Sequence, residues 1–295
     1  LDSLPFPARY LVRNELYRRP DMDVPQTTIV TSRGCPFKCV FCLSRVVAGT
    51  KPRTRAPENI LEEIRECVER FGIRDFLFRS DTFTARRSWI MDFCKALRSS
   101  DLRIRWSCNS RVDTIDTEML SAMKSAGCWL MAFGLESGSQ EILDVIHKGI
   151  SKDQIRNALK ECRRAGIRSS VYFLLGLPWE TEKTFQETVQ FACEISPDFI
   201  EFFYTYPFEG TELYDVCIRE GLLNPDELPS LAYSQPAYAT GHFTLEQLAQ
   251  QRPKALRTFY LRPGYILRTL SRARSLKILA NYVRYGWKQL NYLMR

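Results

Sequence analysis

Residues 35–42 read Cys35-Pro36-Phe37-Lys38-Cys39-Val40-Phe41-Cys42, a C-x3-C-x2-C run with an aromatic residue directly before the last cysteine. Three thiolates on one short loop can bind three irons of a cubane cluster and leave the fourth iron open, since such clusters normally take four thiolates. Thiolates also suit zinc, but zinc sites usually add a fourth cysteine or a histidine nearby. Both histidines, His147 and His242, are far away in sequence, so the spacing favours an iron–sulfur loop over a zinc knuckle or three unrelated thiols.

The other cysteines fit a protein of a reducing compartment. The chain has ten cysteines, but most stand singly within apolar patterns and no secretory signal precedes them. Buried cysteines of this kind behave as small hydrophobic residues. No apolar run approaches the roughly 18 residues of a membrane-spanning helix, so a cytoplasmic protein is predicted.

Strands and amphipathic helices alternate along residues 25–222. Strands are expected at 27–32, 75–78, 103–107, 129–134, 169–175 and 198–204, and helices at 57–71, 86–99, 117–126, 139–146, 152–165, 181–195 and 211–220. This alternation predicts an α/β fold with a parallel sheet and right-handed crossovers. Pattern alone leaves a doubly wound sheet and a partial barrel both open.

Each expected strand is followed by polar or turn residues. The cysteine run follows the first strand, and the later strands end in Arg79-Ser80-Asp81-Thr82, Cys108-Asn109-Ser110-Arg111, Gly134-Leu135-Glu136-Ser137-Gly138, Leu175-Gly176-Leu177-Pro178 and Tyr204-Thr205-Tyr206-Pro207. Functional groups of parallel α/β folds gather at the carboxyl edge of the sheet. Since polar or turn residues follow all six expected strands, and the cysteine loop is one of these segments, we expect them to form one shared site.

The cysteine spacing, the Gly134–Gly138 run, the Gly176-Leu177-Pro178 turn and the Pro207-x-x-Gly210-Thr211 turn resemble the radical S-adenosylmethionine (SAM) enzymes, in particular the subgroup with cobalamin-dependent members and methylthiotransferases. The resemblance covers about residues 25–222. It implies a partial (β/α)6 TIM-like barrel in which Cys35, Cys39 and Cys42 bind a 4Fe-4S cluster. It also implies that SAM chelates the open iron and is cleaved to a 5′-deoxyadenosyl radical, with an electron donor such as flavodoxin or ferredoxin.

Three candidate cofactor-binding residues come from the family pattern. Phe41 would pack near the adenine of SAM, with a core aromatic as the alternative. Asp81 follows the strand where the family keeps contacts to the SAM amino group, although this chain lacks the usual Gly-Gly-Glu string there and an Asp is also a good helix cap. Gly176 would allow close backbone approach to the adenine, or form a plain turn before Pro178.

Three further candidates come from the residues themselves. Asn109 and Arg111 lie two apart and so face the same way on an extended segment. Arg111 can bind the SAM carboxylate in bidentate fashion or pair with Asp113 or Asp116. Glu136 stands between two glycines at a strand exit, where it can accept hydrogen bonds from ribose hydroxyls or the SAM ammonium. No catalytic residue is assigned beyond the cluster, and His147 is left out as a helix C-terminal partner.

The two ends suggest further parts of the protein. Residues 1–24 resemble the linker that joins an N-terminal cobalamin-binding domain to the barrel, which implies that cobalamin is a second cofactor held on a domain missing here. Residues 223–295 are expected to form a helical basic extension, because residues 241–295 hold 11 of the 42 Lys and Arg residues and one of the 34 acidic ones.

The extension leaves two interpretations open. Basic residues interleave with Trp287, Tyr282 and Leu290, which suits the surface of an anionic membrane and would place the protein at its inner face. A helix that packs on the barrel or the missing domain fits equally well. No RNA-binding module is recognisable after the barrel, which argues against nucleic acid.

The leading hypothesis is therefore a radical SAM enzyme, cobalamin-dependent, that methylates or rearranges an unactivated carbon of a small or lipid-like substrate. A methylthiotransferase-like enzyme acting on tRNA is the second hypothesis, although the extension is expected to be helical rather than the strands of an RNA-binding barrel. A non-catalytic zinc or iron–sulfur protein is the third.

Overall fold

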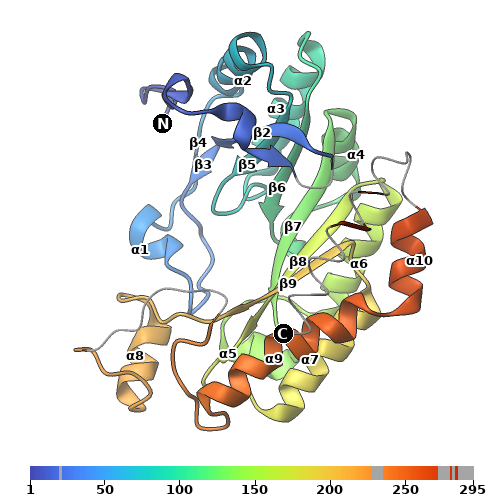
Figure 1. Ribbon diagram of the computed structural model, residues 1–295. Helices are drawn as coiled ribbons and strands as arrows, with labels where there is room; N and C mark the ends of the chain where they lie inside the picture. Colours follow the sequence, from blue (N-terminus) through green and yellow to red (C-terminus); the bar gives the residue numbers. More distant parts are fainter. Residues whose placement is uncertain (20–21, 227–234, 272–279, 281–282, 285–295) are drawn as a thin grey trace.

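The computed structural model describes residues 1–19, 22–226, 235–271, 280 and 283–284. Its main feature is a curled seven-stranded sheet in the order β1-β2-β5-β6-β7-β8-β9 (Figure 1). The strands are β1 (Arg18–Arg19), β2 (Val24–Val30), β5 (Asp75–Arg79), β6 (Arg105–Ser110), β7 (Cys128–Glu136), β8 (Arg168–Leu175) and β9 (Phe199–Tyr204). All pair in parallel except β1, which runs antiparallel to β2.

The strand order decides between the two folds that the pattern left open. From β2 to β9 each strand pairs with the next strand of the sheet along the chain. A doubly wound sheet would reverse its order at a switch point. The order here never reverses, so the sheet curls into the partial (β/α)6 barrel that was predicted, with β1 and β9 as its two edges in the described part of the chain.

Helices connect the strands, and most of them cover the outer face of the sheet (Figure 1). They are α2 (Pro57–Phe71), α3 (Arg87–Ser99), α4 (Thr117–Ser125), α5 (Gln140–Val145), α6 (Lys152–Arg164), α7 (Glu182–Ile195) and α8 (Glu212–Arg219). α2 begins with Pro57 at its first turn and ends at Gly72, whose φ of +66° suits a residue without a side chain. Ser151 and Thr181 form capping boxes that start α6 and α7.

The main core lies between the sheet and these helices. Phe78 of β5 and Trp106 of β6 have ring centroids 5.1 Å apart, and Phe93 of α3 packs edge-on against Phe78 at 5.4 Å. All three side chains are fully buried. These aromatic side chains fill the space between the sheet and the covering helices.

One strand lies later in the chain than the pattern predicted. A strand was expected over 103–107, but β6 spans Arg105–Ser110. Leu102 and Ile104 are buried just before the strand, and the ladder continues through polar residues because parallel pairing requires only the backbone. Asn109 therefore lies within the strand rather than after it.

The extension begins as predicted. α9 (Leu245–Tyr260) and α10 (Pro263–Ser271) are helical. α9 packs on the barrel through buried Leu248, Leu256 and Phe259, while both interpretations of the basic residues after α10 stay predictions. Residues 278–279, 282 and 285–295, which carry most of the membrane interpretation, lie outside the described residues, and the predicted domain boundaries stay predictions. Among the described residues, no helix is both long and apolar enough to cross a bilayer.

Candidate active site

The cysteine loop, residues 35–42, follows β2 and the short strand β3 (Ser32–Arg33) at the carboxyl edge of the sheet. After it come α1 (Ser44–Ala48) and β4 (Arg53–Thr54), which pairs antiparallel with β3. The backbone of Val40 donates to the carbonyl of Ile146 at 3.1 Å and accepts from the amide of Leu213 at 3.0 Å. The middle of the loop is thus held between the end of α5 and the start of α8.

Asp81, at the exit of β5, holds both ends of this loop. One carboxylate oxygen, Oδ2, accepts from the amide of Gly34 at 2.6 Å, and the other, Oδ1, accepts from the Ser44 hydroxyl at 2.7 Å. Gly34 precedes the first cysteine and Ser44 follows the last. Gly34 must be glycine here, because its φ is +95° and a Cβ would lie 2.3 Å from the carbonyl oxygen of Lys51.

Arg111 reaches the middle cysteine from the exit of β6. Its guanidinium makes a bidentate pair with Asp113, with both N–O distances at 2.9 Å, and donates to the carbonyl of Lys148 at 2.6 Å. A third nitrogen, Nη1, lies 3.7 Å from Sγ of Cys39. The guanidinium also stacks on Phe37, 3.7 Å from the ring centroid. The predicted pairing with Asp113 is confirmed, and the group sits against the cysteine loop.

Glu136, the last residue of β7, is buried in the left-handed backbone region with φ of +69°. Such a conformation in a residue other than glycine often marks a functional position. The ammonium of Lys148 donates to Oε1 of Glu136 at 2.7 Å. The carboxylate folds back over Gly134, where a Cβ would lie 2.3 Å from Oε1. A side chain at Gly134 would therefore compete with the Glu136 carboxylate for this space.

Two buried polar atoms beside Asp81 have no hydrogen-bond partner among the described residues. They are Oδ1 of Asn109 and Oγ of Ser80. The amide nitrogen of Asn109 donates to the Ser80 carbonyl at 2.6 Å, so the two orphaned atoms lie at the exits of neighbouring strands. Buried polar atoms normally find partners, and an acceptor with a hydroxyl at this edge fits a ligand that carries ammonium or hydroxyl groups.

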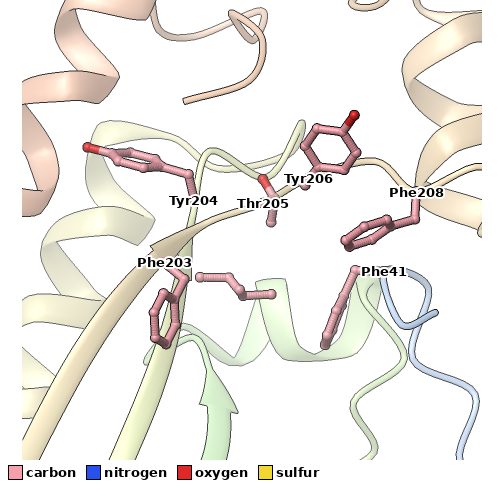
Figure 2. Close-up of a pocket in the computed structure, with 7 residues that line it drawn as sticks. Phe41, Phe203, Tyr204, Thr205, Tyr206 and Phe208 are labelled. Atoms are coloured by element: carbon pink, nitrogen blue, oxygen red, sulfur yellow. The ribbon is translucent and has the colours of Figure 1, made fainter. Parts of the chain in front are cut away.

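An aromatic cavity of about 250 Å³ opens beside the loop. Phe41 and Phe203 lie on opposite sides of it, and Tyr206 and Phe208 close it above in the view of Figure 2. Leu174, Tyr204 and Thr205 complete the lining, and none of the lining residues is charged. Phe41 is half-buried and also packs against the small cluster around Val40 and Leu177. Both predicted roles of Phe41 are compatible with this position.

Gly176 closes the next strand exit, where its φ is +74°. Its amide donates to the buried carboxyl of Glu180 at 2.8 Å, and its carbonyl accepts from Thr205 at 2.7 Å and Tyr238 at 2.8 Å. Burial raises the pKa of Glu180 to about 8, against the lowering effect of the Gly176 amide. The turn below the aromatic cavity is therefore fixed by buried hydrogen bonds.

The three thiols differ in exposure. Cys35 is buried with Sγ 3.6 Å from the Thr82 hydroxyl, whereas Cys39 and Cys42 line an open cavity of about 240 Å³. Burial raises the pKa of the Cys39 thiol, and the cations Lys148 and Arg111 oppose that rise. Within the described residues, no three His, Cys, Asp or Glu side chains are grouped closely enough to hold one metal ion. Three thiols of one loop fit a cluster with three iron ligands.

The structure thus brings most of the predicted residues to one edge of the half-barrel, while their binding roles stay predictions. Sequence reasoning missed Lys148, which lies beside the discounted His147. His147 itself is exposed, and its Nδ1 is 4.0 Å from Glu212. Lys148 follows an expected helix end without any motif, so no local signal indicates that its ammonium turns inward.

Comparison with known proteins gives one family match and several similar sequences. Residues 29–192 match the radical SAM superfamily. A protein described as an uncharacterized methyltransferase of Pyrococcus horikoshii is 33% identical over 92% of this chain and 58% of its own length. Cytidylyl-2-hydroxyethylphosphonate methyltransferase of Streptomyces wedmorensis is 27% identical over 89% of this chain and 52% of its own length. The chain therefore spans a little over half the length of these relatives.

A solved structure shares the fold. The radical SAM methyltransferase TsrM from Kitasatospora setae, with cobalamin and a [4Fe-4S] cluster bound, aligns with a TM-score of 0.63 at 18% identity over 78% of this chain and 44% of its own. That likeness concerns the fold alone. The superfamily match, however, covers more than half of the present sequence and includes all three loop cysteines. The chain belongs to the radical SAM superfamily of enzymes.

Proposed function

We propose that this chain is the barrel of a cobalamin-dependent radical SAM methyltransferase. The observation that carries the proposal is the cysteine loop, which Asp81 and Val40 hold at the carboxyl edge of a half-barrel beside an aromatic cavity. The names of two relatives and of one structural neighbour support methyl transfer. When bound to Cys35, Cys39 and Cys42, the cluster would supply the electron that cleaves SAM to a 5′-deoxyadenosyl radical.

The aromatic cavity would take the adenine of SAM. Its walls offer ring faces at Phe41 and Phe203 and no charged group, which suits a flat, neutral ring. With adenine bound, these apolar side chains would keep water from the space beside the loop, which would protect reactive species from side reactions. The turn at Gly176 holds one wall of the cavity, because its carbonyl accepts from the hydroxyl of the lining residue Thr205.

The charged residues would orient the polar end of SAM. Glu136 is the acceptor proposed for its ammonium or its ribose hydroxyls, and the unpartnered oxygen of Asn109 is a second acceptor. Arg111 is proposed to reach the SAM carboxylate, since its guanidinium already faces Cys39 at 3.7 Å. Lys148 balances the charge of Glu136 until the ligand arrives.

The remaining parts of the proposal concern the whole protein. Cobalamin would be held by another domain and would supply methyl transfer. The substrate is proposed to be a small or lipid-like molecule with an unactivated carbon, since one similar protein is named as the methyltransferase of a small molecule, cytidylyl-2-hydroxyethylphosphonate.

The first test is anaerobic reconstitution with iron and sulfide, reduction by dithionite in the presence of SAM, and an assay for 5′-deoxyadenosine. Product that is lost in Cys39→Ala supports the radical SAM core. An intact 4Fe-4S spectrum without 5′-deoxyadenosine and without any spectral response to SAM would overturn it. Transfer of a labelled methyl group from SAM, dependent on added cobalamin in the full-length protein, tests the methyltransferase assignment separately.

A further inference from the structure

The two faces of the curled sheet differ in chemical character. Successive side chains of a strand point to opposite faces, and one set packs into the main core against the helices: Phe76, Phe78, Trp106, Cys108, Val171 and Phe173. The residues that alternate with them point into the half-barrel, and we call this side the inner face. On β5, β6 and β8 the inner face carries the polar residues Arg79, Ser107, Ser170 and Tyr172.

The hydroxyl groups of this inner face have no partner within the part of the chain that the structure describes. Ser107 and Ser170 are only 3% and 7% exposed, yet neither hydroxyl makes a hydrogen bond there. The hydroxyl of Tyr172 makes none either, although its ring lies 5.6 Å from that of Phe203. Buried hydroxyls normally find partners. A concave surface with unpartnered hydroxyls therefore suits a ligand that brings polar groups of its own.

The strand between these hydroxyls presents a small side chain. Ala132 of β7 is the ladder partner of Ser170 on β8, and Ser107 of β6 is paired with Leu130 two residues before Ala132. Neighbouring strands lie about 4.8 Å apart, so β5 and β8 are separated by about 14 Å along the sheet. A ligand of the size of a sugar phosphate can therefore contact polar side chains on both sides of Ala132.

Arg79 adds a positive charge at one side of this surface. Its side chain is exposed and makes neither an ion pair nor a hydrogen bond among the described residues. Two carboxylates of the same face have other partners, since Asp75 pairs with Arg19 at 3.0 Å and Glu201 pairs with Arg252 at 3.4 Å. A guanidinium without a carboxylate partner can bind a carboxylate, phosphate or phosphonate group through two parallel hydrogen bonds.

The position of Arg79 places this charge near the reaction site. It is the last residue of β5 and lies two residues before Asp81, which holds both ends of the cysteine loop. A ligand held by Arg79 at one end and by the hydroxyls of β6 and β8 at the other would lie across the inner face, next to the loop. Fixing both ends of a reactant in this way favours reaction at one chosen atom.

We propose that the inner face binds the substrate and that this substrate is a small hydroxylated molecule with an acidic group. Arg79 recognises the acidic group, and Ser107, Ser170 and Tyr172 bind the hydroxyl groups. The inference rests on the proposed function, because the reaction takes place in the same half-barrel. It narrows the substrate from a small or lipid-like molecule to a polar, anionic one.

The test measures the binding of three probes to the full-length, reconstituted protein with SAM present. Ribose 5-phosphate carries hydroxyls and an anionic group, ribose carries only the hydroxyls, and ethyl phosphate carries only the anionic group. Ligand-observed NMR titrations give each Kd for the wild type and for Arg79→Met, which keeps a long side chain without its charge. The matched control is Arg98→Met, because Arg98 is exposed on α3, which packs on the other face of the sheet.

We expect the wild type and Arg98→Met to bind ribose 5-phosphate at least tenfold more tightly than either partial probe. Arg79→Met should lose at least tenfold in affinity for both phosphates but not for ribose, and Arg79→Lys should recover part of that loss. Ser107→Ala/Ser170→Ala should weaken both sugars at least threefold and leave ethyl phosphate unchanged. Equal binding of ribose 5-phosphate by the wild type and Arg79→Met would overturn the proposal.

Two other results separate this proposal from its alternatives. A tenfold loss of SAM affinity in Arg79→Met, with unchanged Kd values for the probes, would assign the guanidinium to the carboxylate of SAM and overturn the inferred substrate class. Wild-type protein that forms no 5′-deoxyadenosine with dithionite would contradict the proposed function, whereas the Kd values of the probes would still decide whether the inner face binds a hydroxylated anion.

Discussion

Each carboxylate oxygen of Asp81 is occupied by a different end of the cysteine loop, one by Gly34 and the other by Ser44. Arg111 likewise has two of its nitrogens on Asp113 and one beside Cys39. At the scale of single residues, the charged groups near the cysteines therefore hold the loop as well as facing its thiols. A loop preorganised in this way does not need the cluster to bring its two ends together.

Replacement of Asp81 separates a loop-holding role from direct contact with SAM. Asp81→Ala should destabilise the protein by about 2–4 kcal/mol, because two charge-assisted hydrogen bonds are lost, and should lower the iron bound per chain after reconstitution. Asp81→Asn keeps one carbonyl acceptor and should fall between the wild type and the alanine variant. Urea unfolding of the apoprotein and iron analysis provide the measurements. Normal stability and iron content combined with weakened SAM binding would show that Asp81 is a SAM ligand only.

At the scale of elements, the sequence predicts where polar side chains lie along the chain but not which of them pair with one another. Local rules predict the polar residues after each strand. They also predict that α2 begins at Pro57 and ends before Gly72. The pairing of Glu136 with Lys148 does not, because the ammonium approaches from a turn 12 residues later, and only the assembled fold brings the two side chains within 2.7 Å. Likewise, the choice of Asp113 over Asp116 for Arg111 depends on α4, whose N-cap is Asp116.

The turn after β8 should make stability depend on pH. Burial raises the pKa of the Glu180 carboxyl to about 8 in the folded protein, whereas the pKa of a Glu in an unfolded chain is about 4.3. Between these two pH values, the unfolded state releases a proton that the folded state keeps. The free energy of unfolding should therefore fall as the pH rises, by up to ~1.4 kcal/mol per pH unit. Glu180→Gln, which retains the acceptor for Gly176, should remove this slope. Urea unfolding at pH 5.5 and 8 measures it, with exposed-face Glu182→Gln as control, and an unchanged slope in Glu180→Gln would contradict the assignment.

The loop between β7 and α5 must pass very close to α7. A Cβ at Gly138 would lie 2.7 Å from both Cβ of Phe191 and Cα of Thr188. Gly138→Ala should therefore cost about 2–3 kcal/mol through overpacking. Gly149→Ala is the matched control: its φ is +66° but no atom would lie within 4 Å of the new Cβ, so only backbone strain of about 1 kcal/mol is expected. Equal unfolding free energies for the two variants would argue that α7 moves away to accommodate the methyl group.

At the scale of the whole molecule, the order of the strands places all six exits of the barrel along one curved edge, and this is what turns scattered motifs into a site. Sequence pattern could not choose this order over a doubly wound one, since both bury parallel strands between helices. The resemblance to a known family supplied the choice, and the unreversed order β2-β5-β6-β7-β8-β9 confirms it. The pattern also gave no sign that the first 19 residues lie against the barrel.

That N-terminal segment is fastened by a buried charge cluster. Glu63 of α2 is 1% exposed and pairs with Arg9 at 2.6 Å through one oxygen and with Arg55 through the other. Glu63→Gln leaves two buried guanidinium groups around a neutral amide, so it should cost about 3–5 kcal/mol. Glu66→Gln breaks the exposed pair with Arg70 on the same helix and should cost less than about 0.5 kcal/mol.

The same substitution should release the N-terminal segment before the barrel unfolds. Arg9 ties this segment to the barrel through Glu63 and through its hydrogen bonds to the Thr27 hydroxyl and the Thr28 carbonyl of β2. Without its anionic partner, Arg9 would hold the segment less firmly. Limited trypsin digestion should then cut after Arg13 faster in Glu63→Gln than in Glu66→Gln, under conditions in which the barrel stays intact. Matching digestion rates together with matching unfolding free energies would mean that the segment is held by its backbone contacts to β2 and not by the buried cluster.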